Sequence, residues 1–140
     1  TLGLTVIIIT HEMSVVRQVC DSVSLLEAGR IVESGRLEDI VLDVDSRLSR
    51  EIVPFPKVPE AAVAHGESVI DVSITAHPGQ PAAVALMSMV AELGGDIAAG
   101  VFETIGQAQI GRLAVTVPGS DTEQAVSTLR QAGIAAEVRS

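Results

Sequence analysis

The chain has 140 residues, a formal net charge of −9 and one cysteine, Cys20. Phosphate binding needs a basic face and base stacking needs aromatic side chains, whereas the only aromatic residues are Phe55 and Phe102, so we expect no nucleic-acid partner. A single cysteine excludes an internal disulfide and a cysteine-based metal cluster, and we expect no metal site.

The first pattern is an apolar, largely β-branched run from Leu4 to Ile9 that ends at Thr10 and His11. A continuous run of this kind predicts a strand buried on both faces of a parallel sheet. Ligands of such sheets lie beyond the carboxyl ends of the strands, which is where His11 falls. A histidine in this position more often has a structural role than a ligand-binding one, so the residue alone decides nothing.

The segments after His11 change period twice. Residues 12–21 predict a short helix for which Thr10 is a plausible cap. Residues 21–35 then predict two short strands about a turn at Gly29, and the spacing of residues 36–42 is helical again.

These residues resemble the C-terminal end of the nucleotide-binding domain of ABC transporters. Ile9-Thr10-His11-Glu12 is similar to the switch-histidine segment of that family, and the run from Leu26 to Gly35, which contains Gly29-Arg30-Ile31-Val32-Glu33, is similar to its hairpin. The resemblance implies that His11 contacts the γ-phosphate of ATP, bound with Mg²⁺ in the complete protein. A charge-assisted hydrogen bond from imidazole to phosphate suits that role.

Other parts of such an ATPase are absent from these 140 residues. The phosphate-binding loop needs Gly-x-x-x-x-Gly-Lys-Ser/Thr, but the only lysine is Lys57, between prolines. We therefore expect the chain to be the C-terminal part of a longer protein. Residues 1–43 are interpreted as the tail of the ATPase domain, and the proline-containing residues 44–66 as a linker.

Residues 67–140 predict a separate small domain. Strands are expected at 68–75, 97–105, 112–117 and 134–138, and helices after Pro81 and after Ser120. The order βαββαβ is the ferredoxin-like arrangement, so the predicted fold class is an α/β ATPase tail followed by an α+β domain. Such a small core without disulfide or metal is marginal, which favours a homodimer.

Three side chains of this domain carry specific expectations. Met87 is expected in the core and Met89 on another side of its helix, where it could line a dimer interface or a pocket that suits a thioether. Arg112, which follows Gly111 at the start of a strand, is expected to form a surface ion pair.

A βαββαβ unit after an ABC ATPase tail resembles one subgroup, the ATP-binding subunits of bacterial methionine importers. Ile110-Gly111-Arg112-Leu113 looks like the third strand of their regulatory domain. The resemblance implies a peripheral protein on the cytoplasmic side of the cell membrane, a homodimer with a transmembrane permease partner, and methionine as an inhibitory ligand. It places the ligand near Gly100, Val101 and Phe102, with Asp96 holding the ammonium group where the family commonly has asparagine.

Two other readings remain open at this point. The ferredoxin-like part could be a generic amino-acid sensor on another ABC ATPase, or a dimerisation element without a ligand. The fold hosts many functions, so only the residues of the site can separate these readings.

The missing phosphate loop gives a first prediction. We expect the 140-residue chain by itself to show no Mg²⁺-dependent ATP hydrolysis, because His11 is one phosphate contact among the many that an ATPase requires. A coupled phosphate-release assay checks this. Turnover that His11→Ala abolishes would contradict it.

Overall fold

The computed structural model describes residues 3–76, 79 and 82–139. The N-terminal half contains short helices and one hairpin, and the C-terminal half contains longer elements. The bounds in chain order are α1 Met13–Val19, β1 Ser22–Glu27, β2 Arg30–Arg36, α2 Leu37–Leu42, α3 Arg47–Ile52, β3 Glu67–Ala76, α4 Ala82–Glu92, β4 Asp96–Ile105, β5 Ala108–Pro118, α5 Thr122–Gln131 and β6 Ala135–Val138. The expected turn before α4 falls on residues 77–81, of which only Gly79 is described.

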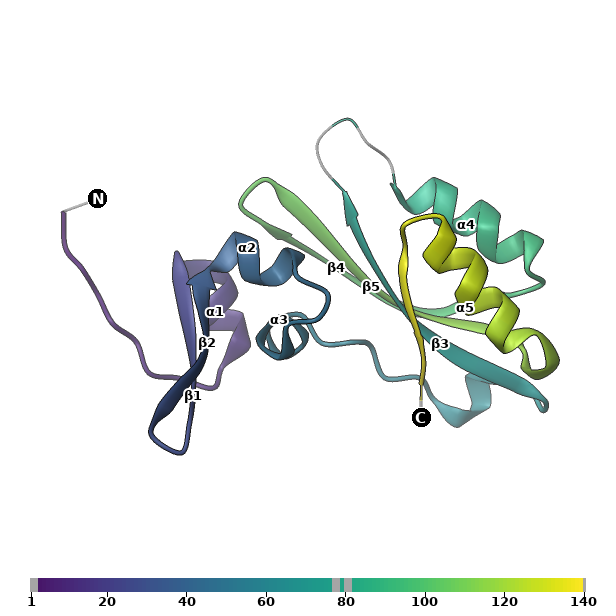
Figure 1. Ribbon diagram of the computed structural model, residues 1–140, viewed down its shortest axis with the longest axis horizontal. Helices are drawn as coiled ribbons and strands as arrows, with labels where there is room; N and C mark the ends of the chain where they lie inside the picture. The colour runs from purple at the N-terminus through teal and green to yellow at the C-terminus, as the bar shows by residue number, and fades with distance from the viewer. Residues whose placement is uncertain (1–2, 77–78, 80–81, 140) are drawn as a thin grey trace.

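The C-terminal half is an antiparallel four-stranded sheet covered by two helices. Its strands lie in the order β4-β5-β3-β6, and α4 and α5 lie on one face (Figure 1). The two central strands, β3 and β5, pair with Glu67 opposite Pro118 and Ala76 opposite Gln109. This is the βαββαβ order expected from the sequence, so the predicted fold class is confirmed.

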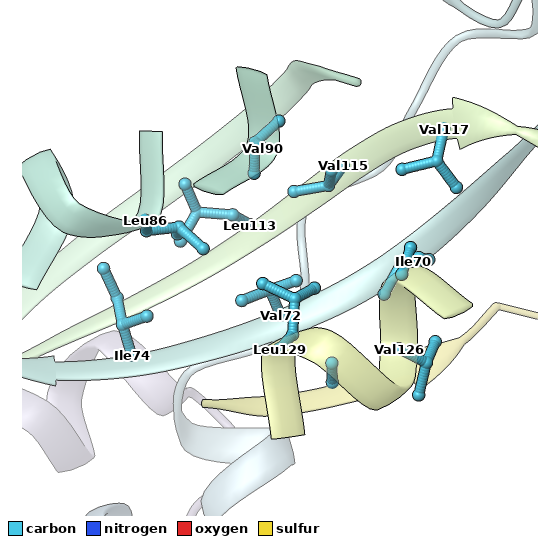
Figure 2. Packing of buried hydrophobic residues seen from close by; sticks show 12 residues of the cluster. Ile70, Val72, Ile74, Leu86, Val90, Leu113, Val115, Val117, Val126 and Leu129 are labelled. Atoms are coloured by element: carbon cyan, nitrogen blue, oxygen red, sulfur yellow. The ribbon is translucent and has the colours of Figure 1, made fainter. Parts of the chain in front are cut away.

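The core of this half forms where the two helices meet the sheet. Alternate residues of β3 and β5 point to the helices because successive strand side chains point to opposite faces. Figure 2 shows them interdigitated with residues of both helices. The buried members of this cluster, called here the main core, are Ile70, Val72, Ile74, Leu86, Val90, Leu113, Val115, Val117, Ala125, Val126, Leu129 and Ala136.

Helix α4 turns a different face toward the core than the sequence predicts. Met87 is 59% exposed, whereas Met89 packs against the main core. The inward positions are set by Leu86 and Val90, and Met89 lies three residues after Leu86, on the same side of the helix. The prediction of Met87 in the core is therefore wrong, because the apolar helix offered two possible inward faces, whereas a role of Met89 at an interface stays a prediction.

The expected hairpin is confirmed. β1 and β2 pair antiparallel from Ser22 opposite Arg36 to Glu27 opposite Arg30. The connecting residues Ala28 and Gly29 both have positive φ, 48° and 76°, as the tight type I′ hairpin turn requires. Glycine reaches that conformation without strain, which explains the Gly29 signal in the sequence.

The apolar run at Leu4–Ile9 does not form the expected strand. Residues 4–12 have no helix or strand, and Ile7 and Ile9 are 87% and 98% exposed. A strand needs neighbours that take up its backbone hydrogen bonds, and no strand of the described residues pairs with this run. The prediction of a buried strand is wrong for this structure, although the composition of the run is that of a buried one.

A second hydrophobic cluster joins the two halves of the chain. It lies on the sheet face opposite α4 and α5, next to the end of the β4–β5 hairpin (Figure 1). Helix α3 belongs to it, although residues 44–66 are interpreted as a linker. The buried members of this cluster, called here the joint core, are Val16, Leu37, Val41, Leu48, Ile52, Val53, Ile105, Ala108 and Ile110.

Two glycines on neighbouring strands give a matched stability prediction. A Cβ on Gly111 would lie 2.7 Å from Ile74 Cγ1 and 2.8 Å from Phe102 Cε1, whereas a Cβ on Gly100 would lie 3.6 Å from Leu113 Cδ2. We expect Gly111→Ala to lower the free energy of unfolding by about 1–3 kcal/mol through overpacking. Gly100→Ala should change it by no more than about 1 kcal/mol. Urea denaturation of both variants checks this, and equal losses would contradict it.

Candidate functional site

His11, the expected phosphate contact, lies in the exposed segment before α1. Its neighbour Thr10 accepts a hydrogen bond from the Glu12 backbone N–H at 3.0 Å, and α1 begins at Met13. The N-cap of α1 is Glu12 and has no side-chain cap hydrogen bond, so the prediction of Thr10 as the cap is wrong; the Thr10 side chain instead stabilises the turn before the helix. The side chain of His11 itself is exposed to solvent.

The other expected site residues lie together on β4. Asp96 is the first residue of the strand and is exposed, and its Oδ1 accepts the Ile97 backbone N–H at 2.8 Å. Gly100, Val101 and Phe102 follow in the middle of the strand. The register shifts between Ile97 and Ala99, so a bulge separates Asp96 from the other three residues.

The pairing with β5 assigns these residues to two faces of the sheet. Gly100 lies opposite Leu113 and Phe102 opposite Gly111, on the face that α4 and α5 cover. Val101 lies opposite Arg112, on the other face. The structure therefore places the four predicted residues along one strand, but their side chains do not line one face.

These residues do share the free edge of the sheet. Among the described strands, β4 has β5 as its sole neighbour, so its outer backbone N–H and C=O groups are unpaired in the sheet. Phe102 is 47% exposed at this edge, and the absence of a Gly100 side chain leaves the backbone open. The arrangement suits a ligand or strand that binds along the edge through main-chain hydrogen bonds.

Arg112 occupies a position that the sequence did not predict. It is 2% exposed, and its guanidinium donates to Val53 O at 3.0 Å, to Ser49 Oγ at 2.7 Å and to Ser73 Oγ. The ring of Phe55 lies 5.4 Å from the guanidinium carbon. The expectation of a surface ion pair is wrong because α3 and the residues after it cover this face of the sheet.

The guanidinium is held by neutral groups rather than by a carboxylate. Burial lowers the pKa of Arg112 below its usual value, and repulsion from Arg50 adds to the shift. An arginine side chain nevertheless stays charged near neutral pH, so its fork of N–H donors needs the surrounding oxygens. Ser49, Phe55 and Ser73 lie far from Arg112 in the sequence, and no local pattern indicates that they surround it.

A search for a metal site gives a negative result within the described part of the chain. No group of three or more histidine, cysteine, aspartate or glutamate side chains there is placed to hold an ion. Helices of those residues are also too short or too polar to cross a membrane.

Comparison with known proteins confirms the predicted resemblance. The chain is 37% identical over 139 residues to the methionine import ATP-binding protein MetN of Streptomyces griseus, covering 98% of this chain and 38% of that protein. It is 33% identical over 138 residues to MetN of Myxococcus xanthus, covering 97% of this chain and 41% of the relative. No protein-family model matches the chain.

A third relative shows a similar degree of identity. Methionine import ATP-binding protein MetN 2 of Yersinia pestis is 32% identical over 142 aligned residues, which cover 98% of this chain and 42% of that protein. The chain spans about two fifths of the length of the curated relatives it matches, 38% to 42% in these three cases. The match therefore includes both the N-terminal helices and the four-stranded sheet.

The buried guanidinium leads to a stability prediction. Arg112→Met should lower the free energy of unfolding by about 2–4 kcal/mol, because it leaves buried oxygens without their donors. Arg112→Lys should recover only part of this loss, since an ammonium group cannot reproduce the planar fork. The exposed Arg30 is the control, and Arg30→Met should stay within about 0.5 kcal/mol. Urea denaturation measures all three, and a loss for Arg112→Met no larger than the control's would contradict the assigned role.

Proposed function

From the similarity of this chain to methionine import ATP-binding proteins, we propose that it is part of the ATP-hydrolysing subunit of a methionine importer, in which the four-stranded domain senses methionine and inhibits transport. The names of the relatives support the transporter assignment. In the complete protein, ATP and Mg²⁺ are the expected cofactors, and His11 contacts the γ-phosphate. The partner is a transmembrane permease, and the subunit lies on the cytoplasmic side of the membrane.

The observation that carries the sensor proposal is the free edge of β4. The unpaired amides and carbonyls of this strand suit the carboxylate and ammonium ends of an amino acid. The half-exposed Phe102 ring offers the apolar contact that a thioether prefers. Asp96, exposed at the start of the strand, supplies negative charge for an ammonium group.

The same edge supports a homodimer. A second copy can cover part of this edge with its own β4, which shields both exposed edges and leaves the remaining amides and carbonyls for the ligand. Helix α4 adds exposed apolar side chains to the C-terminal half, with Val84 65% and Met87 59% exposed. In the proposed mechanism, methionine at such an interface favours the resting arrangement of the two subunits, and a tenfold preference for it corresponds to about 1.4 kcal/mol.

A binding experiment tests the sensor proposal. Isothermal titration of the chain with methionine should give a saturable signal that Gly100→Trp weakens at least tenfold, because an indole beside the Phe102 ring obstructs the apolar contact proposed for the thioether. Thr104→Trp is the matched control, since Thr104 is exposed two residues beyond Phe102 on the same strand and face, and it should leave the affinity within about twofold.

The remaining outcomes separate the alternatives. Sedimentation velocity on the same samples should show a dimer at micromolar concentration. Binding of several amino acids with equal affinity would identify a generic sensor. A dimer that binds no amino acid would reduce the domain to a dimerisation element, and a monomer without binding would contradict the proposal entirely.

A further inference from the structure

Strand β4, which carries the proposed ligand site, has one part with an open edge and one part that contacts other elements. From Asp96 to Phe102 its outer edge is open, whereas from Glu103 onwards it contacts the N-terminal helices. The part that contacts the helices continues through the turn into β5 and is called here the hairpin tip, residues 103–110. Its contacts reach all three helices α1, α2 and α3.

The first contact is polar and involves α1. Arg17 on this helix lies 3.6 Å from Glu103, measured from Nε to Oε1, and both side chains are partly shielded from solvent. The same guanidinium donates to the carbonyl of Ile52 at the end of α3, at 2.6 Å. Arg17 therefore connects α1, α3 and β4 through one side chain.

The second contact fixes the turn against α2. Glu38 Oε1 accepts the backbone N–H of Gln107 at 2.9 Å. Gly106 has a φ of +60°, and a Cβ placed on it would lie 2.1 Å from Glu38 Oε1. The turn therefore lies directly against the carboxylate, and its positive φ favours glycine at this position.

The third contact is apolar. Ile105, Ala108 and Ile110 of the hairpin tip are at most 4% exposed and belong to the joint core with residues of α1, α2 and α3. Densely packed contacts of this kind transmit displacements rather than absorb them. Helix α1 begins two residues after His11. The hairpin tip and the segment with His11 are therefore both connected to α1.

We propose that the β4–β5 hairpin is a lever that couples the free edge of β4 to helix α1 through Arg17–Glu103, Glu38–Gln107 and the joint core. A ligand that orders the free edge also orders α1, and loosening the hairpin tip releases α1 from the sheet. The direction of regulation rests on the proposed function, whereas the mechanical coupling does not. Coupling of this kind needs a direct test, because spatial continuity alone does not establish it.

Hydrogen exchange of the whole chain, read residue by residue, tests the lever without any ligand. In the double variant Glu38→Ala/Glu103→Gln we expect exchange at residues 105–110 and at residues 13–19 of α1 to rise together, at least fivefold, while the β3 amides facing β6 stay unchanged. Glu103→Gln removes the contact with Arg17 of α1 directly, so the single variant Glu38→Ala, whose substitution lies on α2, reports the coupling and should also raise exchange at residues 13–19. Asp39→Ala/Glu92→Gln is the control. Asp39 lies beside Glu38 in the same helical turn, and the side chains of Asp39 and Glu92 are both exposed.

A second measurement adds methionine as the probe. In the unsubstituted chain, saturating methionine should slow exchange at residues 96–102 and at α1, whereas in the double variant it should slow exchange at residues 96–102 only. Slowing confined to β4 in the unsubstituted chain would overturn the lever and leave the sensor proposal intact. If methionine slows nothing, the sensor proposal fails, and the double variant decides the lever alone: a faster hairpin tip with an unchanged α1 would overturn it.

Discussion

The buried guanidinium of Arg112 is the constraint on which the arrangement of the two halves depends. A cation that is 2% exposed must have its donors satisfied, and it finds oxygens on β3, on α3 and at the residue after α3. Ser49 and Val53 are close in the sequence, but both are far from Ser73 and from Arg112. They converge only when α3 lies on the open face of the sheet, so the arginine fixes that packing as well as benefiting from it.

The end of α3 receives arginines from both sides. Arg17 donates to the carbonyl of Ile52 and Arg112 to the carbonyl of Val53. The last carbonyls of a helix lack partners within it and carry partial negative charge, so two guanidinium groups satisfy them and favour the helix. A six-residue helix would be marginal alone. Here its C-terminal end contacts both α1, through Arg17, and the sheet, through Arg112, in addition to the direct contact between Arg17 and Glu103 of β4.

The exposed run at Leu4–Ile9 shows that local composition alone does not decide whether a segment is a buried strand. Its residues are those of a buried strand, yet the run lies in solvent because no strand among the described residues takes up its hydrogen bonds. The relatives are more than twice as long as this chain, which matches 38% to 42% of them. The contrast between composition and environment is therefore consistent with the proposed origin of this segment in a larger ATPase sheet.

The sequence by itself determined the elements whose signals are local. Alternation in β3 and β5, the Gly29 turn, and the resemblance of the His11 segment to ABC ATPases all follow from short patterns, and they gave the βαββαβ order correctly. Only the tertiary structure decided which face of α4 turns inward, so that Met89 rather than Met87 packs against the main core. It also decided that Arg112 is buried, that Asp96 and Val101 lie on one face of β4 and Gly100 and Phe102 on the other, and that α3 covers the sheet. Those outcomes depend on partners distant in the sequence, and no local period encodes them.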